Sequence, residues 1–135
     1  MEFAVETGSR TELVDITAEV TRRVKASGVS EGLCLVFVPH TTAGVTINED
    51  ADPDVRLDLV AALERMVPDR AGYRHAEGNS PAHVKAGLMG SSQTIAIVNG
   101  EIALGRWQGI FLCEFDGPRR RRVELRILEA AFKEM

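Results

Sequence analysis

Apolar and polar residues alternate, or apolar residues run together, in several short stretches that predict β-strands. These stretches are residues 2–7, 11–15, 33–38, 45–49, 93–98, 101–104, 107–115 and 119–128. The run LCLVFV at 33–38 is apolar throughout, so both faces of that strand are expected to be buried. Short turns between neighbouring strands predict a hairpin at the N-terminus, a type I′ hairpin at Asn99-Gly100 and an antiparallel meander at the C-terminus.

Three other segments have the spacing and the end signals of helices. They are residues 18–27, with Thr17 as N-cap and Gly28 as the stop; residues 53–67, started by Asp52 and Pro53; and a short helix that Ser80 and Pro81 start and that ends near Gly90. Residues 68–79 are polar, contain glycine and show no periodicity, which predicts a loop. Loops of this length in a compact domain often carry function.

Helices that interrupt strand runs, instead of alternating regularly with strands, indicate the α+β class. We expect a mainly antiparallel, two-sheet β-sandwich-like core with two to three helices packed outside. The chain has 135 residues, of which 44% are hydrophobic and 27% charged. These values suit one globular domain over residues 1–135, with a core large enough to fold alone.

The charge balance and the cysteines narrow the class of protein. A net charge of −4 at pH 7 provides no long-range attraction to nucleic acid or to an anionic membrane. Cys34 and Cys113 lie in apolar runs and form no C-x-x-C pair, so we expect buried, reduced thiols. The first residues include charges, and no stretch approaches the roughly 20 apolar residues of a membrane span. A soluble, cytoplasmic protein is therefore expected.

The three histidines are the main functional signal. His40 follows a strand, His75 lies in the polar loop, and His83 lies in the first turn of a helix, where the partial positive charge favours a neutral imidazole. None of these positions belongs to the predicted core. Three histidines with an open fourth position often hold catalytic zinc, so one interpretation is a shared site with a divalent metal, zinc in the first place. Taken singly, each histidine fits an ordinary polar surface role better than metal ligation.

Several polar residues could complete such a site. Thr41 and Thr42 can donate hydroxyl hydrogen bonds to a phosphate, and the helix start at Asn79 offers backbone N–H groups to an anion. Turn and capping chemistry is the simpler explanation of these three residues. Trp107 and Gln108 lie near a strand start and could contact a ligand, although packing in a core or an interface is the commoner role of a tryptophan.

Strand parity divides the four arginines at residues 119–122. Arg119 and Arg121 share a face with apolar residues, whereas Arg120 and Arg122 lie on the other face. The first pair can reach a pocket and bind phosphate or carboxylate, and solvated charge suits the second pair. Glu114 lies within an apolar strand, where a buried carboxylate needs a cation, a metal or hydrogen bonds. The arginines of the next strand are its nearest candidate partners.

Three motifs occur together in this order: PHTTAGVTINED, RHAEGNSPAHVKAGLMGSS and GRWQGIFLCEFDGPRRRR. In sequence and spacing they resemble the YjbQ family, whose members are described as secondary thiamine-phosphate synthases, and the resemblance covers nearly the whole chain. It implies a β-rich, sandwich-like fold and a homotrimer with sites close to the subunit boundaries. It also implies that His40, His75 and His83 form the site around a metal. Other motif positions match Thr41, Asn48, Glu49, Asn79, Lys85, Trp107, Gln108, Glu114 and Arg119, with Glu49 as a further catalytic candidate.

Strand arithmetic separates Glu49 from the rest of the implied site. If the strands on either side of residues 40–43 form a simple hairpin, Glu49 lies on the order of 15 Å from His40, at about 3.3 Å per residue. Glu49 could not then bind the same metal within one subunit. Three alternatives stay open: the two strands belong to different ladders, Glu49 serves a site in a neighbouring subunit, or Glu49 is structural.

Two classes of function fit these residues. The first is an enzyme of the thiamine-phosphate synthase-like transferase class, which would bring a pyrimidine diphosphate and a thiazole phosphate together while a metal and cations neutralise the leaving pyrophosphate. Metal-dependent hydrolysis of a phosphate ester would use nearly the same residues. The second class is a non-catalytic trimeric module that binds a small anion or stores a metal.

Overall fold

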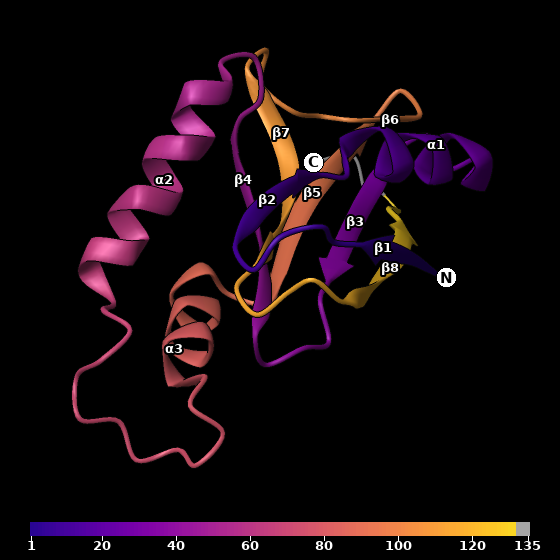
Figure 1. Cartoon of the computed structure of the whole chain (residues 1–135). Coiled ribbons are helices and arrows are strands. Elements are labelled where there is room, and N and C mark those ends of the chain that lie inside the picture. Colours follow the sequence, from indigo (N-terminus) through magenta and orange to yellow (C-terminus); the bar gives the residue numbers. More distant parts are fainter. Residues whose placement is uncertain (132–135) are drawn as a thin grey trace.

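The computed structural model describes residues 1–131, which form eight strands and three helices (Figure 1). In chain order these are β1 (Glu2–Glu6), β2 (Glu12–Asp15), α1 (Thr17–Ser27), β3 (Gly32–Phe37), β4 (Ala43–Glu49), α2 (Pro53–Met66), α3 (Ser80–Met89), β5 (Ser92–Val98), β6 (Glu101–Ile102), β7 (Gln108–Glu114) and β8 (Arg120–Glu129). Each predicted strand and helix corresponds to one of these elements, with ends that differ by a few residues at most.

The strands form two antiparallel sheets. The five-stranded sheet has the order β1-β8-β3-β5-β6, and the three-stranded sheet has the order β2-β7-β4. Every neighbouring pair in both sheets is antiparallel. The predicted α+β class with a two-sheet antiparallel core is therefore confirmed.

The larger of two hydrophobic cores fills the space between the sheets. Val36 of β3 and Leu125 of β8 are buried on one side of this core, and Val45 of β4 and Leu112 of β7 on the other. Helix α1 adds its buried valines, Val20 and Val24. This core holds the two sheets face to face.

The smaller core lies on the other face of the three-stranded sheet. Side chains on a strand alternate between its faces, so Phe111 and Cys113 of β7 point away from the larger core. They pack against Leu63 of α2 and Ala82 and Ala86 of α3. In Figure 1 both helices lie beside β4, on the side away from β3.

Four short connections between strands cross from one sheet to the other. They join β1 to β2, β3 to β4, β6 to β7, and β7 to β8. The predicted N-terminal hairpin and C-terminal meander are therefore wrong, and β3 and β4 belong to different ladders. Turn residues show where the chain reverses, but not whether the next strand pairs with the last one or packs across the core from it.

The predicted hairpin at Asn99-Gly100 is confirmed. Strands β5 and β6 pair through Ile97 with Ile102 and Val98 with Glu101. Asn99 and Gly100 have φ values of 51° and 80°, as a type I′ turn requires.

Strand β3 buries only one of its faces. Cys34 and Val36 point into the larger core, whereas Leu33 and Phe37 are 45% and 37% exposed. The prediction that both faces are buried is wrong, because α2 and α3 pack on the three-stranded sheet and α1 packs into the core between the sheets. The outer face of the five-stranded sheet therefore keeps exposed apolar side chains.

Two helices begin one residue earlier than predicted. Thr17 and Ser80, expected as N-caps, are the first residues of α1 and α3, and Ile16 and Asn79 occupy the cap positions without a capping side-chain bond. This moves His83 from the third to the fourth residue of its helix. Helix α2 starts as predicted.

The cysteines are buried free thiols, as predicted. Burial raises the pKa of Cys34 to about 11 and that of Cys113 to about 12. Among residues 1–131, none of the helices combines the length and the apolar character that crossing a bilayer requires.

Candidate functional site

The connections after β1, β3 and β7 meet at one end of the sandwich. The hydroxyl of Thr7, which follows β1, donates to Glu114 Oε1 at 2.7 Å and accepts the backbone N–H of Arg119 at 2.8 Å. The backbone N–H of Phe115 donates to the carbonyl of Thr42 at 3.2 Å. These bonds tie the connection after β1 to those before β4 and β8.

A buried ion pair lies under this junction. Arg121 Nε donates to the two carboxylate oxygens of Glu114 at 2.9 and 3.1 Å, and Arg121 Nη2 binds Glu114 and also donates to Thr42 Oγ1 at 2.8 Å. Burial raises the pKa of Glu114, but hydrogen bonds from Arg121, Thr7 and the Asp116 N–H outweigh it and hold that pKa below its usual value. The expected pairing of Glu114 with an arginine of the next strand is confirmed.

A hollow of about 450 Å³ opens beside this ion pair and is lined by all three histidines. His40 comes from the connection between β3 and β4, His75 from the loop before α3, and His83 from α3. The rings of His75 and His83 are 5.3 Å apart between centroids and nearly perpendicular, at 88°. We call this hollow the histidine pocket. Its other lining residues include Thr41, Thr42, Glu77, Asn79, Asp116, Arg119 and Arg121.

A backbone hydrogen bond orients His40. The N–H of Arg122 donates to His40 Nε2 at 2.9 Å, so the proton of the neutral ring lies on Nδ1. Burial lowers the pKa of His40, and the positive charges of Arg121 and Arg122 lower it further. His40 is therefore a neutral hydrogen-bond donor in the histidine pocket.

Asp116 organises the opposite wall of the histidine pocket. Its Oδ2 accepts from Asn79 Nδ2 and from Arg119 Nη2, each at 3.0 Å. Burial raises the pKa of Asp116, but these hydrogen bonds lower it more, so the net shift is downward. A carboxylate can only accept, and this holds the amide nitrogen of Asn79 and the guanidinium of Arg119 in place.

The charges that line the histidine pocket balance. Arg119 and Arg121 supply two positive charges, and Glu77 and Asp116 supply two negative ones. With neutral histidines the lining has a formal charge of zero. Arg119 is exposed and held by Asp116, whereas Arg121 is buried and held by Glu114.

The donor set fits a metal only in part. His75 and His83 lie close together, and Glu77 Oε2 is 3.8 Å from His75 Nε2. His40 has no free lone pair, because Nε2 accepts the Arg122 N–H and Nδ1 carries the proton. Within residues 1–131, no group of three or more histidine, cysteine, aspartate or glutamate side chains converges as metal ligands. As the side chains lie, the three-histidine set does not fit a metal.

Four predicted site residues lie at the opposite end of β4 and β7. Ala43, at the start of β4, pairs with Glu114, whereas Glu49, at its end, pairs with Gln108. At 3.3 Å per residue the two ends of β4 are about 20 Å apart. Asn48 and Trp107 lie at the same end as Glu49.

Side chains at this far end make local contacts. Asn48 accepts the N–H of Glu49 at 2.8 Å, and Gln108 accepts the N–H of Gly105 at 2.8 Å. Trp107 is 55% exposed. Within one chain these residues do not reach the histidine pocket.

Lys85 also points away from the histidine pocket. It is 2% exposed, and its Nζ lies 3.0 Å from Glu64 Oε1. This contact joins α3 to α2, so within one chain Lys85 links the two helices and is absent from the pocket lining.

Two residues that the sequence did not single out line the histidine pocket. Asp116 precedes Gly117-Pro118, so the sequence marks it only as a turn residue, and Glu77 lies in a loop without periodicity. The sequence does place an arginine, Arg119, three residues after Asp116, which is close enough to pair with it. A turn aspartate with a nearby arginine is nevertheless too common to indicate a functional site.

Sequence and structure comparisons identify the relatives of this chain. The model of the UPF0047 protein YjbQ-like family matches residues 1–130. The chain belongs to the YjbQ-like UPF0047 family. A UPF0047 protein of Methanocaldococcus jannaschii is 48% identical over 127 residues, which are 94% of this chain and 92% of that protein. The UPF0047 protein YugU of Bacillus subtilis is 44% identical over 125 residues, or 92% of this chain and 95% of that protein.

Solved structures of YjbQ-like proteins have the same fold. A crystal structure of a YjbQ/UPF0047 family protein from Clostridium acetobutylicum has a TM-score of 0.93 and 52% identity, and the match covers 95% of this chain and 99% of that one. A structure from Sulfolobus solfataricus, described as a YbjQ-like protein of unknown function, has a TM-score of 0.92 and 33% identity, with 96% of each chain covered.

Proposed function

We propose that the histidine pocket is the active site of an enzyme that binds one phosphorylated small molecule. The observation that carries this proposal is the convergence of three histidines, distant in sequence, with Arg119 and Arg121 on one hollow of about 450 Å³. A hollow of this size suits a small molecule. Guanidinium groups bind phosphate oxygens, and imidazoles transfer protons near neutral pH.

Each residue has a distinct role in this proposal. The phosphate binds to Arg119, the hydroxyl of Thr41 and the Nδ1–H of His40. Asp116 holds the guanidinium of Arg119 and also holds Asn79, the residue before α3. In hydrolysis of a phosphate ester, the imidazole of His75 or His83 takes a proton from water as the water oxygen bonds to phosphorus. The same proton passes to the ester oxygen as the P–O bond breaks.

The charge of the histidine pocket favours a single phosphate over two anionic substrates. Thiamine-phosphate synthesis, which the family resemblance implies, would bring a diphosphate and a phosphate together. A lining with two positive and two negative side chains does not offset that charge. Thiamine-phosphate synthase-like transfer is therefore the second candidate, and it requires further positive charge.

A divalent metal, with zinc as the first expectation, is one source of that charge. His75 and His83 would hold it, with Glu77 as the nearest carboxylate. His40 could join them only after releasing the Arg122 N–H. Bound there, the metal would supply positive charge beside the substrate.

The alternative is a non-catalytic trimeric module in which the histidine pocket only holds a small anion or a metal. The same residues would bind inorganic phosphate, but no substrate would be converted. Turnover therefore separates this alternative from an enzyme.

A homotrimer would bring the separated motif residues together. We propose that Asn48, Glu49, Trp107 and Gln108 of one subunit complete the histidine pocket of its neighbour, since about 20 Å separates them within one chain. Mixing His83→Ala subunits with Glu49→Ala subunits should restore part of the phosphate release that each variant lacks alone. If the mixture releases no more phosphate than its components, the shared site is wrong.

The experiment that tests the proposed function is a titration with inorganic phosphate and thiamine monophosphate, followed by ³¹P NMR of phosphate release and by metal analysis of the same protein. His40→Ala should weaken phosphate binding at least tenfold, because it removes the Nδ1–H donor to the phosphate. His83→Ala should reduce phosphate release, because it removes a candidate base. Val84→Ala is the control, since Val84 is an exposed neighbour on the same helix that does not line the histidine pocket.

Three results would decide among the candidates. Phosphate release that is lost in His83→Ala supports the hydrolase. Condensation of a pyrimidine diphosphate with a thiazole phosphate supports the transferase. Phosphate binding without turnover supports the binding module, and equal phosphate binding by His40→Ala and Val84→Ala contradicts the site itself.

A further inference from the structure

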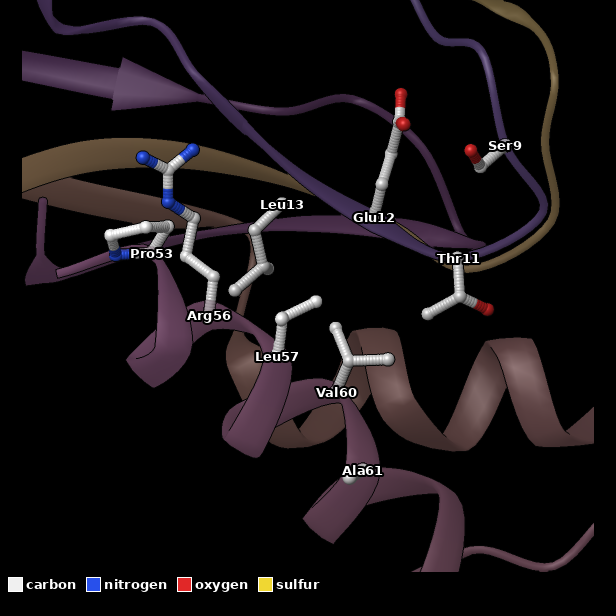
Figure 2. A pocket seen from close by; sticks show the side chains of 9 residues that line it. All are labelled: Ser9, Thr11, Glu12, Leu13, Pro53, Arg56, Leu57, Val60 and Ala61. Carbon is white, nitrogen blue, oxygen red and sulfur yellow. The ribbon is translucent and has the colours of Figure 1, made fainter.

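A second hollow lies between strand β2 and helix α2, on a different part of the molecule from the histidine pocket. It is a groove of about 500 Å³, and Figure 2 shows Thr11 and Leu13 on its strand side and Leu57 and Val60 on its helix side. Pro53 and Ala61 lie toward its two ends (Figure 2). We call it the β2–α2 groove.

Helix α2 exposes more apolar surface than its packing explains. Leu63 is buried in the smaller core, and Val60 packs against that core. Leu57 is 68% exposed, and Pro53, Leu57 and Ala61 follow one another at intervals of four residues along the groove side. An exposed apolar stripe of this kind indicates a contact with another molecule.

Strand β2 offers unpaired backbone groups beside this stripe. It is an edge strand, because the order of its sheet is β2-β7-β4. The N–H of Ile16 donates to the carbonyl of Ile110 on β7 at 2.9 Å. In an antiparallel pair, the backbone groups of every second residue point to the same neighbour, so the backbone N–H and C=O of Glu12 and Val14 also point to β7. The N–H and C=O of Leu13 therefore point to the open side, where an added strand could pair with them.

Arg56 marks one end of the groove with a positive charge. Its guanidinium stacks over the ring of Phe111 at 5.0 Å, and its Nε is buried without a hydrogen-bond partner among the described residues. Figure 2 shows the guanidinium at the Pro53 end, with its terminal nitrogens directed away from the helix. A guanidinium in this setting suits a carboxylate.

We propose that the β2–α2 groove binds an extended peptide that adds as an antiparallel strand to β2, with an acidic residue at its first position and apolar residues at its third and fifth. Alternate residues share one face, so the acidic side chain would meet the Arg56 guanidinium at the Pro53 end, and the two apolar side chains would lie along the apolar wall that runs from Leu57 to Ala61. The eight-residue step from Pro53 to Ala61 spans about 12 Å of helix, which matches about four residues of extended chain. This function is independent of the histidine pocket.

The test is an NMR titration of the protein with the acetylated, amidated peptide Glu-Thr-Val-Thr-Val-Thr. We expect saturable shifts confined to the amides of residues 9–15 and 53–61. Arg56→Gln should lower the affinity for this peptide about tenfold. It should leave unchanged the affinity for a second peptide in which Gln replaces Glu at the first position. Leu57→Asp should abolish binding by placing a charge on the apolar wall.

Leu88→Asp is the matched control, because Leu88 is a 56% exposed leucine on α3 that does not line the groove. It should bind the peptide as the unmodified protein does. The proposal is overturned by absence of saturable binding, by shifts outside the groove, or by equal binding to Leu57→Asp and Leu88→Asp. It is also overturned if Leu57→Asp alone changes the oligomeric state in sedimentation equilibrium, since the occupant is then a second copy of this chain.

Discussion

The two ends of the three-stranded sheet differ in how their polar residues are held. At the crossing end, where the chain passes three times between the sheets, Glu114 and Arg121 are buried and bonded to Thr7 and Thr42 from other segments. At the far end, the side chain of Glu49 is bonded within its own stretch of chain, where it accepts the N–H of Ala51 at 3.0 Å.

The motif residues therefore divide into two groups that are held in place by different kinds of contact. Polar groups at the crossing end are fixed by bonds between segments far apart in sequence, and the histidine pocket opens beside them. Polar groups at the far end are fixed by adjacent backbone and remain accessible to another molecule. The following predictions test this contrast, from the largest expected effect to the smallest.

Glu114→Ala should lower the free energy of unfolding by about 3–5 kcal/mol, because it leaves the buried Arg121 guanidinium unpaired. Urea denaturation measures this change. Glu49→Ala at the far end should change stability by no more than about 0.5 kcal/mol. The double variant Glu114→Leu with Arg121→Met should recover much of the loss, and an equal loss in Glu114→Ala and Glu49→Ala would contradict the contrast.

Gly117→Ala should destabilise the crossing end by about 1–3 kcal/mol. A Cβ at this position would lie 2.3 Å from the carbonyl oxygen of Ser9 and 2.8 Å from Glu114 Cγ. Gly8→Ala in a neighbouring connection is the control, since a Cβ there meets nothing within 4 Å. The midpoint of thermal unfolding should be lower for Gly117→Ala than for Gly8→Ala. Equal midpoints would show that the connection between β7 and β8 can rearrange to accept a side chain at residue 117.

Arg119→Gln should weaken binding of inorganic phosphate to the histidine pocket about tenfold, or about 1.4 kcal/mol, because it removes the exposed cation of the pocket lining. Arg106→Gln is the control at the far end, where the Arg106 guanidinium lies 4.8 Å from the centre of the Trp107 ring. Calorimetric titration measures both. A larger loss in Arg106→Gln would place the anion at the far end, or across a subunit boundary.

The ring of His40 should titrate below 6.5, the usual value for histidine, since burial and the neighbouring arginines lower its pKa. The unfolded chain then binds a proton more readily than the folded one, so stability falls as pH drops below 6.5. The lowered pKa of Glu114 adds a separate loss of stability at lower pH, below 4.5. NMR titration of the ring measures the first effect, and a midpoint above 6.5 would contradict the burial of the ring beside Arg121 and Arg122.

Local sequence signals predicted the elements but not all of their pairings. The helix start at Asp52-Pro53 and the turn at Asn99-Gly100 depend on residues next to each other in the chain, and both are confirmed. The N-terminal hairpin and the C-terminal meander failed because the same turn residues allow the next strand to join the other sheet. The starts of α1 and α3 shifted by one residue, because Ile16 and Asn79, and not Thr17 and Ser80, occupy the cap positions.

Among the candidate site residues, too, the sequence predicted the local features and missed the contacts between distant segments. The alternation of residues 119–122 indicated that Arg121 points inward, and the isolation of Glu114 in an apolar strand indicated that it needs a cation. Neither pattern identified Asp116, whose bonds to Asn79 and Arg119 exist only once α3 lies against the turn before β8.

The sequence by itself determined the periodicities, the turns, the family and the residue types from which a polar site could form, because these depend on neighbouring residues. Only the tertiary structure decided which strands share a sheet, that His40, His75 and His83 line one hollow, and that Glu49 lies at the opposite end of β4, about 20 Å from Ala43. The physical reason is that sheet membership depends on which apolar faces can be buried together. That choice is made by the whole chain at once.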